Sequence, residues 1–205
     1  MNLQHEFYRK CLHLLLLVIP LTYHYLGKWK ALMIFTPITL IVLSLDFARR
    51  YSPKIKNIFA KIFGPVLRPH ELTGEKLCGA SFVGLATCLN FSLFKPEIAI
   101  CGFLILIICD TAAALIGKAY PSKPFFEKSS AGSLSFFIFG LLILAGCGIG
   151  FHMGAWFYVF GIFAVFCVTM FEARPSLFNT DDNFVIPIGF SVIMTFFDLV
   201  WNYSY

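Results

Sequence analysis

Residues 98–133 read IAICGFLILIICDTAAALIGKAYPSKPFFEKSSAGS, and this stretch decides the fold. The part from Ile98 to Ile116 is apolar along almost its whole length, as a bilayer-spanning segment must be, yet Asp110 lies inside it. A charge at such a depth costs on the order of 3 kcal/mol, so it is seldom kept without a function. One interpretation is an acid that only packs against a neighbouring lysine. The bases and hydroxyls that follow Asp110 favour the other, a functional site.

The composition indicates a membrane protein. Of the 205 residues, 59% are hydrophobic and 13% are charged, which leaves too little polar surface to cover a soluble domain. Long apolar runs fall at about 11–27, 31–47, 77–94, 98–117, 133–151, 155–171 and 185–201. The sequence therefore predicts an all-α fold, a polytopic membrane helix bundle of about seven transmembrane helices, in a single integral membrane catalytic domain over residues 1–205.

Basic residues are unevenly shared between the two sides of these spans. One side holds Arg9, Lys10, Arg49, Arg50, Lys54, Lys56, Lys61, Arg68, Lys76, Lys118, Lys123, Lys128 and Arg174. The other side holds Lys28, Lys30 and Lys95. The positive-inside rule then predicts a cytoplasmic N-terminus and an external C-terminus, and the compact length favours a bacterial inner membrane. Topology and attraction to anionic lipid explain the net charge of +5, so no nucleic-acid partner is expected.

The segment at about 52–68, SPKIKNIFAKIFGPVLR, differs from the spans. Ser52 is suited to cap a helix and Pro53 to its first position. Apolar residues recur at helical spacing while lysines take the opposite face, and the segment is too short to cross a bilayer. We expect an amphipathic helix that lies in the cytoplasmic interface rather than a solvated linker.

Small residues in the apolar runs point to close packing. The fifth run carries several glycines, and GFHMG at 150–154 matches the GxxxG pattern, which close helix packing would explain. The same face would allow a homodimer. The seven cysteines are scattered without a CxxC pair, so we expect buried packing residues rather than disulfides or metal ligands.

Acidic residues gather on the same side as the basic ones. Only Glu97 and Asp198 fall on the other side. A transporter more often places its charges near the midplane. The one-sided distribution favours an enzyme that acts at the cytoplasmic interface on a lipid and a water-soluble anion.

The mixture of polar residues narrows the chemistry to phosphoryl transfer. Asp110 and the cluster Asp181-Asp182-Asn183 supply the oxygen ligands that Mg²⁺ takes together with substrate phosphates. Lys118, Lys128, Ser129 and Ser133 supply cations and donors for phosphate oxygens. The sequence has no GxxxxGK[ST] loop, which excludes an ordinary P-loop nucleotide site.

Four stretches resemble one family of membrane enzymes. They are HEFYRKCLHL at 5–14, LDFARRYSP at 45–53, CDTAAALIGKAYPSKPFFEKSSAGSLSFF at 109–137 and FEARPSLFNTDDNFVIPI at 171–188. Together they are similar to the CTP-dependent lipid kinases: dolichol kinase, phytol kinase and yeast-type diacylglycerol kinase. That family is distantly similar to phosphatidate cytidylyltransferases, whose Pro-Lys-Arg signature is missing here.

The resemblance implies a set of site residues. The catalytic residues would be Asp110, Glu172, Asp181 and Asp182, with Mg²⁺ held by Asp110 and Asp182. The nucleotide- and phosphate-binding residues would be Arg9, Lys10, Gly117, Lys118, Lys128, Ser129, Gly132, Ser133 and Asn183. The proton of the acceptor would pass to Asp181 or Glu172; His13 is an alternative, although it is better read as a packing residue. Asp46, Arg49 and Arg50 either anchor the second span or orient the nucleotide, and the anchoring role is favoured.

The resemblance also implies the reaction. The γ-phosphate of CTP would pass to the hydroxyl of a membrane lipid alcohol, diacylglycerol or a polyprenol-type alcohol, and CDP would leave. Two alternatives stay open: a CTP-dependent cytidylyltransferase of a lipid phosphate, and a small non-catalytic transporter or structural membrane protein. The replacement of Asp110 by Asn is expected to abolish turnover while leaving the fold in place.

Overall fold

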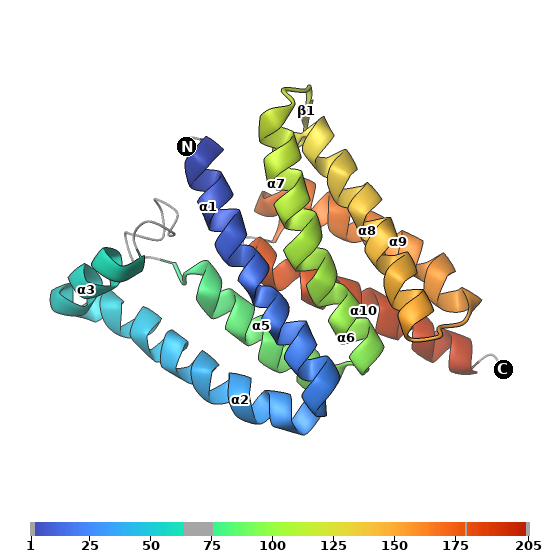
Figure 1. The fold of residues 1–205 in the computed structure, drawn as a ribbon, viewed down its shortest axis with the longest axis horizontal. Helices are drawn as coiled ribbons and strands as arrows, with labels where there is room; N and C mark the ends of the chain where they lie inside the picture. Colours follow the sequence, from blue (N-terminus) through green and yellow to red (C-terminus); the bar gives the residue numbers. More distant parts are fainter. Residues whose placement is uncertain (1–2, 64–75, 179, 204–205) are drawn as a thin grey trace.

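The helix that carries Asp110 lies at the centre of the bundle. The computed structural model describes residues 3–63, 76–178 and 180–203, and in it residues Pro96–Ala119 form one continuous apolar helix. That helix consists of α6 (Pro96–Leu104), the π-helical turn η2 (Ile105–Cys109) and α7 (Asp110–Ala119). In its most apolar 18-residue stretch 72% of the residues are buried, more than in the other long apolar helices. Figure 1 shows this helix among the others of the bundle.

The remaining elements surround this central helix and are nearly all helical. They are α1 (Leu3–Leu14), η1 (Leu15–Leu17), α2 (Val18–Tyr51), α3 (Pro53–Phe63), α5 (Gly79–Leu93), α8 (Ser130–Gly150), α9 (Ala155–Ala173), η3 (Pro175–Leu177) and α10 (Asp182–Tyr203), with the short strands β1 (Pro124–Phe125) and β2 (Lys128–Ser129). The predicted all-α bundle is confirmed.

Five helices in the described part of the chain are long and apolar enough to cross a membrane. They cover Arg9–Tyr51, Pro96–Ala119, Ser130–Gly150, Ala155–Ala173 and Asp182–Trp201, and α5 is a shorter apolar helix. The first of them consists of two helical arms, because the chain turns back at Gly27, where φ is +76° (Figure 1). The protein is therefore an integral membrane helix bundle. By length and composition the count is five, so the seven predicted spans are not confirmed.

Glycines allow α8 and α9 to approach closely, as predicted, but not at the expected motif. A Cβ atom on Gly140 would lie 2.6 Å from Cγ1 of Val165, and one on Gly148 would lie 2.5 Å from the Tyr158 ring. Gly150, by contrast, ends α8 and meets no atom within 4 Å. The GFHMG motif lies in the turn between the two helices, so its assignment to close packing was wrong.

The predicted amphipathic helix is present as α3. Ser52 Oγ accepts a hydrogen bond from the amide of Ile55 at 3.5 Å, as a capping residue does. The buried face of α3 includes Phe59, whose ring lies 4.6 Å from the guanidinium of Arg49. Residues 64–68, the end of the predicted segment, lie outside the described residues.

Asp46 and Arg49 form a buried anchor between α2 and the segment that enters α5. The two side chains are ion-paired at 2.5 Å. Asp46 also accepts hydrogen bonds from the amide of Cys78 at 2.7 Å and the hydroxyl of Ser81 at 2.5 Å, and Arg49 donates to the carbonyl of Lys76 at 3.2 Å. This network supports the anchoring role; Arg50 is exposed and takes no part in it.

Two features of the fold were not predicted. One is the hairpin of β1 and β2, in which Phe125 pairs with Lys128 and Phe126 adopts a positive φ of 53°. The other is the π-helical turn just before Asp110. All seven cysteines are free; Cys78, Cys101, Cys109 and Cys147 are buried as expected, whereas Cys11 is exposed and Cys88 and Cys167 are half-buried.

Candidate active site

A polar cavity of about 610 Å³ opens at one end of the bundle. Side chains from α1, α5, α7, β2, α9 and α10 meet there. Of the predicted site residues, those that line it are Arg9, Asp110, Gly117, Lys118, Lys128, Ser129, Gly132, Glu172, Asp181 and Asp182. Residues that the sequence did not single out are Lys76, Leu77, Phe82, Glu127, Ser176 and Thr180. Lys10, Ser133 and Asn183, although predicted, are not part of its lining.

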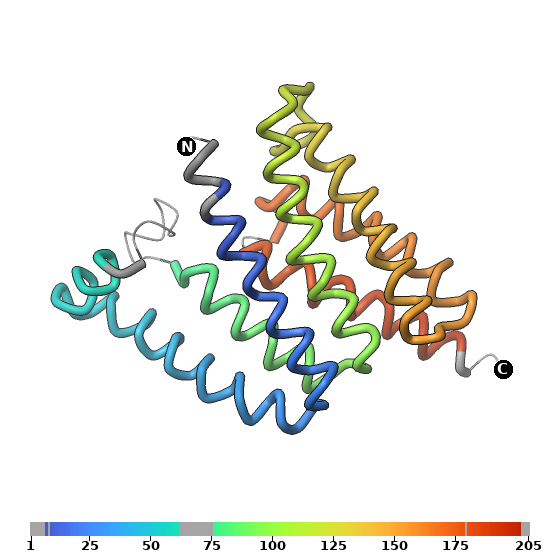
Figure 2. The backbone as a smooth tube through the Cα atoms, in the orientation of Figure 1, coloured from blue at the N-terminus to red at the C-terminus, as the bar shows by residue number. Residues whose placement is uncertain are grey.

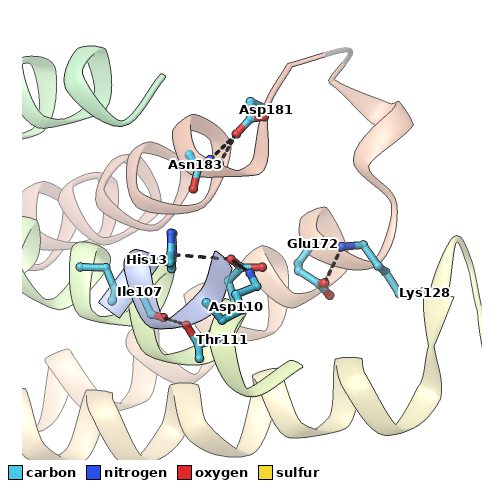
Figure 3. A network of polar contacts seen from close by, with 9 residues as sticks. His13, Ile107, Asp110, Thr111, Lys128, Glu172, Asp181 and Asn183 are labelled. Atoms are coloured by element: carbon cyan, nitrogen blue, oxygen red, sulfur yellow. Dashed lines mark hydrogen bonds and ion pairs between the residues drawn. The ribbon is translucent and has the colours of Figure 1, made fainter. Parts of the chain in front are cut away.

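Asp110 is held by two residues of α1, the helix that runs beside α7 (Figure 2). Lys10 Nζ donates to Asp110 Oδ2, and His13 Nε2 lies 3.5 Å from the same oxygen (Figure 3). Lys10 is 3% exposed and Asp110 is 5% exposed, so the pair is buried. Lys10 therefore pairs with Asp110 rather than reaching the cavity, and His13 packs beside the same carboxylate.

A wide helical turn presents Asp110. The π-helical residues Ile105–Cys109 end immediately before it, and Thr111 Oγ1 donates to the carbonyl of Ile107 at 2.6 Å (Figure 3). Such turns are rare and occur frequently at functional sites. No periodicity in an apolar run distinguishes five π-helical residues from α-helical ones, so this turn could not be predicted.

Lys128 and Glu172 form the second charged pair of the cavity. Their Nζ and Oε1 atoms are 3.0 Å apart (Figure 3). Burial alone would lower the pKa of Lys128, but the carboxylates of Glu172, Asp182 and Asp110 together raise this pKa above its usual value. Glu172 is buried, and among the described residues its Oε2 has no hydrogen-bond partner. That oxygen is an unsatisfied buried acceptor on a residue that lines the cavity.

The start of α8 forms a third part of the cavity. Ser129 Oγ caps the helix by accepting from the amide of Gly132 at 3.1 Å, and it donates to the carbonyl of Gly117 at 3.4 Å. A Cβ atom on Gly132 would lie 2.9 Å from the carbonyl oxygen of Ala113, so only glycine lets α7 and α8 approach this closely. The positive end of a 21-residue helix thus faces the cavity, as in many phosphate sites.

The acidic cluster lies at the start of α10. Asp181 Oδ1 accepts hydrogen bonds from the amide of Asn183 at 3.0 Å and from its side-chain amide at 2.7 Å (Figure 3). Asn183 therefore completes a helix cap instead of lining the cavity. Asp182 does line it, within electrostatic range of Asp110 and Lys128.

The carboxylates fit a metal ion that arrives with a polyphosphate. In residues 3–63, 76–178 and 180–203, no three His, Cys, Asp or Glu side chains are grouped to hold a metal ion. Mg²⁺ in nucleotide sites takes only one or two protein carboxylates and completes its shell with water and phosphate oxygens. Asp110 and Asp182 supply two such groups, and both Lys10 and His13 contact Asp110 through Oδ2.

Taken together, the fold and the site define an integral membrane protein with a one-sided cavity that combines carboxylates, cations and a helix N-terminus. No family model and no solved structure matches the chain. The uncharacterized protein RP860 of Rickettsia prowazekii is 31% identical over 197 residues, which is 94% of each chain. CTP-dependent diacylglycerol kinase 1 of Eremothecium gossypii is 27% identical over 177 residues, and its Saccharomyces cerevisiae counterpart is 26% identical over 178 residues.

The chain is a homologue of these CTP-dependent diacylglycerol kinases. The matched regions cover 75% and 76% of this chain but only 54% and 60% of the two fungal kinases. The chain thus corresponds to somewhat more than half the length of the curated kinases it matches.

Proposed function

We propose that this protein transfers the γ-phosphate of CTP to the hydroxyl of a membrane lipid alcohol, with diacylglycerol or a polyprenol-type alcohol as the acceptor. The observation that carries the proposal is the polar cavity. Ion pairs, a helix N-terminus and two metal-compatible carboxylates meet there, in a family whose curated members are named as CTP-dependent diacylglycerol kinases.

The residues of the cavity divide the work of phosphoryl transfer. Lys128, Lys118 and Arg9 bind phosphate oxygens and oppose the charge that develops in the transition state. The first amides of α8 bind a phosphate, and the Ser129 cap fixes them in position. Lys10, which is buried against Asp110, keeps this carboxylate ionised and oriented.

Mg²⁺ is the metal we propose, held by Asp110 and Asp182. When bound, it would neutralise phosphate charge and orient the transferred group. The free Oε2 of Glu172 accepts the proton of the lipid hydroxyl as the new P–O bond forms and the bond to CDP breaks. Asp181 is the weaker candidate for this role, because its Oδ1 is already engaged by Asn183.

The finer topology is part of the same proposal. The two arms of the first long helix, α5 and the four other long helices would give seven crossings. The cavity and the N-terminus would then face the cytoplasm of a bacterial cell, and the C-terminus would lie outside.

The test is a purified-protein assay with labelled CTP and ATP in parallel, with Mg²⁺ and a panel of diacylglycerol, dolichol, other polyprenols, phytol and farnesol in detergent micelles. We expect a labelled lipid monophosphate and CDP from one acceptor. Release of pyrophosphate would instead indicate a cytidylyltransferase. Intact CTP with every acceptor would contradict the enzyme and favour a transporter or structural protein.

A matched pair of lysines links the activity to the cavity. Lys118, in the last turn of α7, lines it, whereas Lys123, five residues further along between α7 and β1, is exposed and does not. Lys118→Ala should lower turnover by about 10²-fold, as loss of one preorganised electrostatic contact does. Lys123→Ala should leave turnover unchanged.

A further inference from the structure

A second hollow lies beside the polar cavity and is apolar. This groove has a volume of about 520 Å³ and is lined by Leu43, Ser44, Phe47, Ala48 and Leu77. Among the described residues that line it, Ser44 is the one polar side chain, and it donates its hydroxyl to the carbonyl of Leu40 at 2.7 Å. The part of the groove formed by these residues therefore offers a hydrocarbon surface to a ligand.

Leu77 lines both the groove and the polar cavity. Its neighbour Lys76 lines the polar cavity and not the groove. The backbone on each side of Leu77 is fixed to α2, because Arg49 donates to the carbonyl of Lys76 at 3.2 Å and the amide of Cys78 donates to Asp46 at 2.7 Å. The side chain of Leu77 is thus held in place between the apolar groove and the polar cavity.

The groove lies along a candidate membrane span. Four of its five lining residues belong to the α2 arm of a candidate membrane span, and Phe47 is 55% exposed. A hydrocarbon chain on this face would run along α2 and end near Leu77, next to the polar cavity. Among membrane components, an amphiphile with a small polar end fits this arrangement.

We propose that the groove binds a hydrocarbon chain of the lipid alcohol acceptor and directs its hydroxyl past Leu77 into the polar cavity. This inference rests on the proposed function. Because the chain only exchanges one hydrocarbon environment for another, the groove contributes position rather than hydrophobic free energy. Changes to the groove should therefore alter the KM for long-chain acceptors and leave the KM for short-chain acceptors unchanged.

The kinetic test fills the groove. Ala48→Trp places a large side chain in it, and Leu45→Trp places the same side chain on an exposed position of α2 outside it. With dioleoylglycerol, Ala48→Trp should raise KM at least about tenfold, while Leu45→Trp resembles the wild type. With dibutyrylglycerol, and for the KM of CTP, all three proteins should agree. Equal KM values for dioleoylglycerol in the two variants would overturn the inference.

A binding test is independent of turnover. A diacylglycerol with a diazirine on its acyl chain is photolysed with the wild-type protein, and the labelled residues are mapped by mass spectrometry. We expect labels on Phe47 and Leu77 that excess unlabelled dioleoylglycerol displaces. Labels spread evenly along α2, including Ile41, and not displaced would indicate bulk membrane lipid and reject the groove.

The two tests also separate the inference from the proposed function. Displaceable labels in a protein that leaves CTP intact would support the groove and contradict the kinase. Turnover without displaceable labels or a chain-length effect would support the kinase and contradict the groove.

Discussion

Asp110 carries its charge inside the bundle because Lys10 lies against it. The lysine is 3% exposed and has come from a helix 100 residues earlier in the chain. Removal of one member of a buried ion pair leaves the other charge without compensation, which costs about 3–5 kcal/mol. The structure therefore changes what we expect of substitutions at Asp110.

Asp110→Asn should abolish turnover and also lower the free energy of unfolding by about 3–5 kcal/mol, because Lys10 stays buried without its counter-charge. The expectation from the sequence, that the fold stays in place, is kept, but the structure adds a loss of stability to it. The measurements are CTP turnover and unfolding in detergent followed by circular dichroism.

A double variant separates the two effects of this substitution. In Lys10→Met with Asp110→Asn both charges are gone, so stability should recover most of the loss while turnover stays absent. A double variant as unstable as Asp110→Asn alone would show that the ion pair is not the source of the destabilisation.

Lys128 should remain protonated at alkaline pH. The surrounding carboxylates outweigh burial and raise its pKa above the usual value of about 10.4. Because the folded-state pKa is the higher one, the contribution of the Lys128–Glu172 pair to stability is fully present below the unfolded pKa and is lost as the pH rises through the folded pKa.

The pH profile of turnover should consequently show no alkaline fall from Lys128 below about pH 10. Lys128→Met should lower turnover by about 10²-fold across the whole range, since the charge on phosphate is lost at every pH. If the wild type falls steeply between pH 8 and 9 and Lys128→Met removes that fall, Lys128 titrates at a lower pH than its surroundings imply.

Residue chemistry was the part of the site most open to prediction. Asp110, Lys118, Lys128 and Glu172 are separated in sequence, yet the cavity brings them together, because apolar spans of similar length return the polar ends to one side. The pairing of Lys10 with Asp110 could not be read from spacing, since contacts between helices depend on their rotation. One signal existed: Lys10 and His13 are three residues apart and so share a helix face.

At the scale of elements, the contact between α7 and α8 shapes the cavity. Gly132→Ala should destabilise the protein by about 1–3 kcal/mol, because the new Cβ would lie 2.9 Å from a backbone oxygen that cannot move away alone. Gly146→Ala in the same helix meets no atom within 4 Å and should be neutral or stabilising by up to about 1 kcal/mol. Thermal unfolding of the two variants side by side measures the difference. Equal stabilities would mean that α7 and α8 do not pack as described.

Element boundaries were predicted unevenly, for physical reasons. The apolar runs predicted the positions of the long helices, because a bilayer requires about 20 apolar residues per crossing. The hairpin of β1 and β2 carries Lys128 and Ser129 into the site, but its strands of two residues each leave no periodicity to detect. The GxxxG pattern was misassigned because spacing alone does not tell a helix interior from the turn that follows it.

On the scale of the whole molecule, the two ends of the bundle differ in their number of basic residues. At the end opposite the cavity, Lys95 pairs with Asp198 at 2.6 Å and Lys28 donates to the carbonyl of Ser92 at 2.6 Å. These basic residues are few and are satisfied locally, whereas the cavity end presents many cations to a soluble anion. Under the positive-inside rule this asymmetry would orient the protein in a membrane, and it would also attract the proposed nucleotide to the cavity end.

The orientation is tested with a membrane-impermeant maleimide on a background in which reactive native cysteines are replaced by serine. Lys123→Cys, at the cavity end, should label only in inverted vesicles, and Lys30→Cys, at the turn after Gly27, only in intact cells. Both positions are exposed, so access depends on the side of the membrane rather than on burial. Labelling of both from the same side would contradict a bundle that spans the membrane between them. If Lys123→Cys instead labelled only in intact cells and Lys30→Cys only in inverted vesicles, the bundle would still span the membrane but in the reverse orientation. The cytoplasmic site would then be rejected, since CTP would have no access to Lys128 and Asp182.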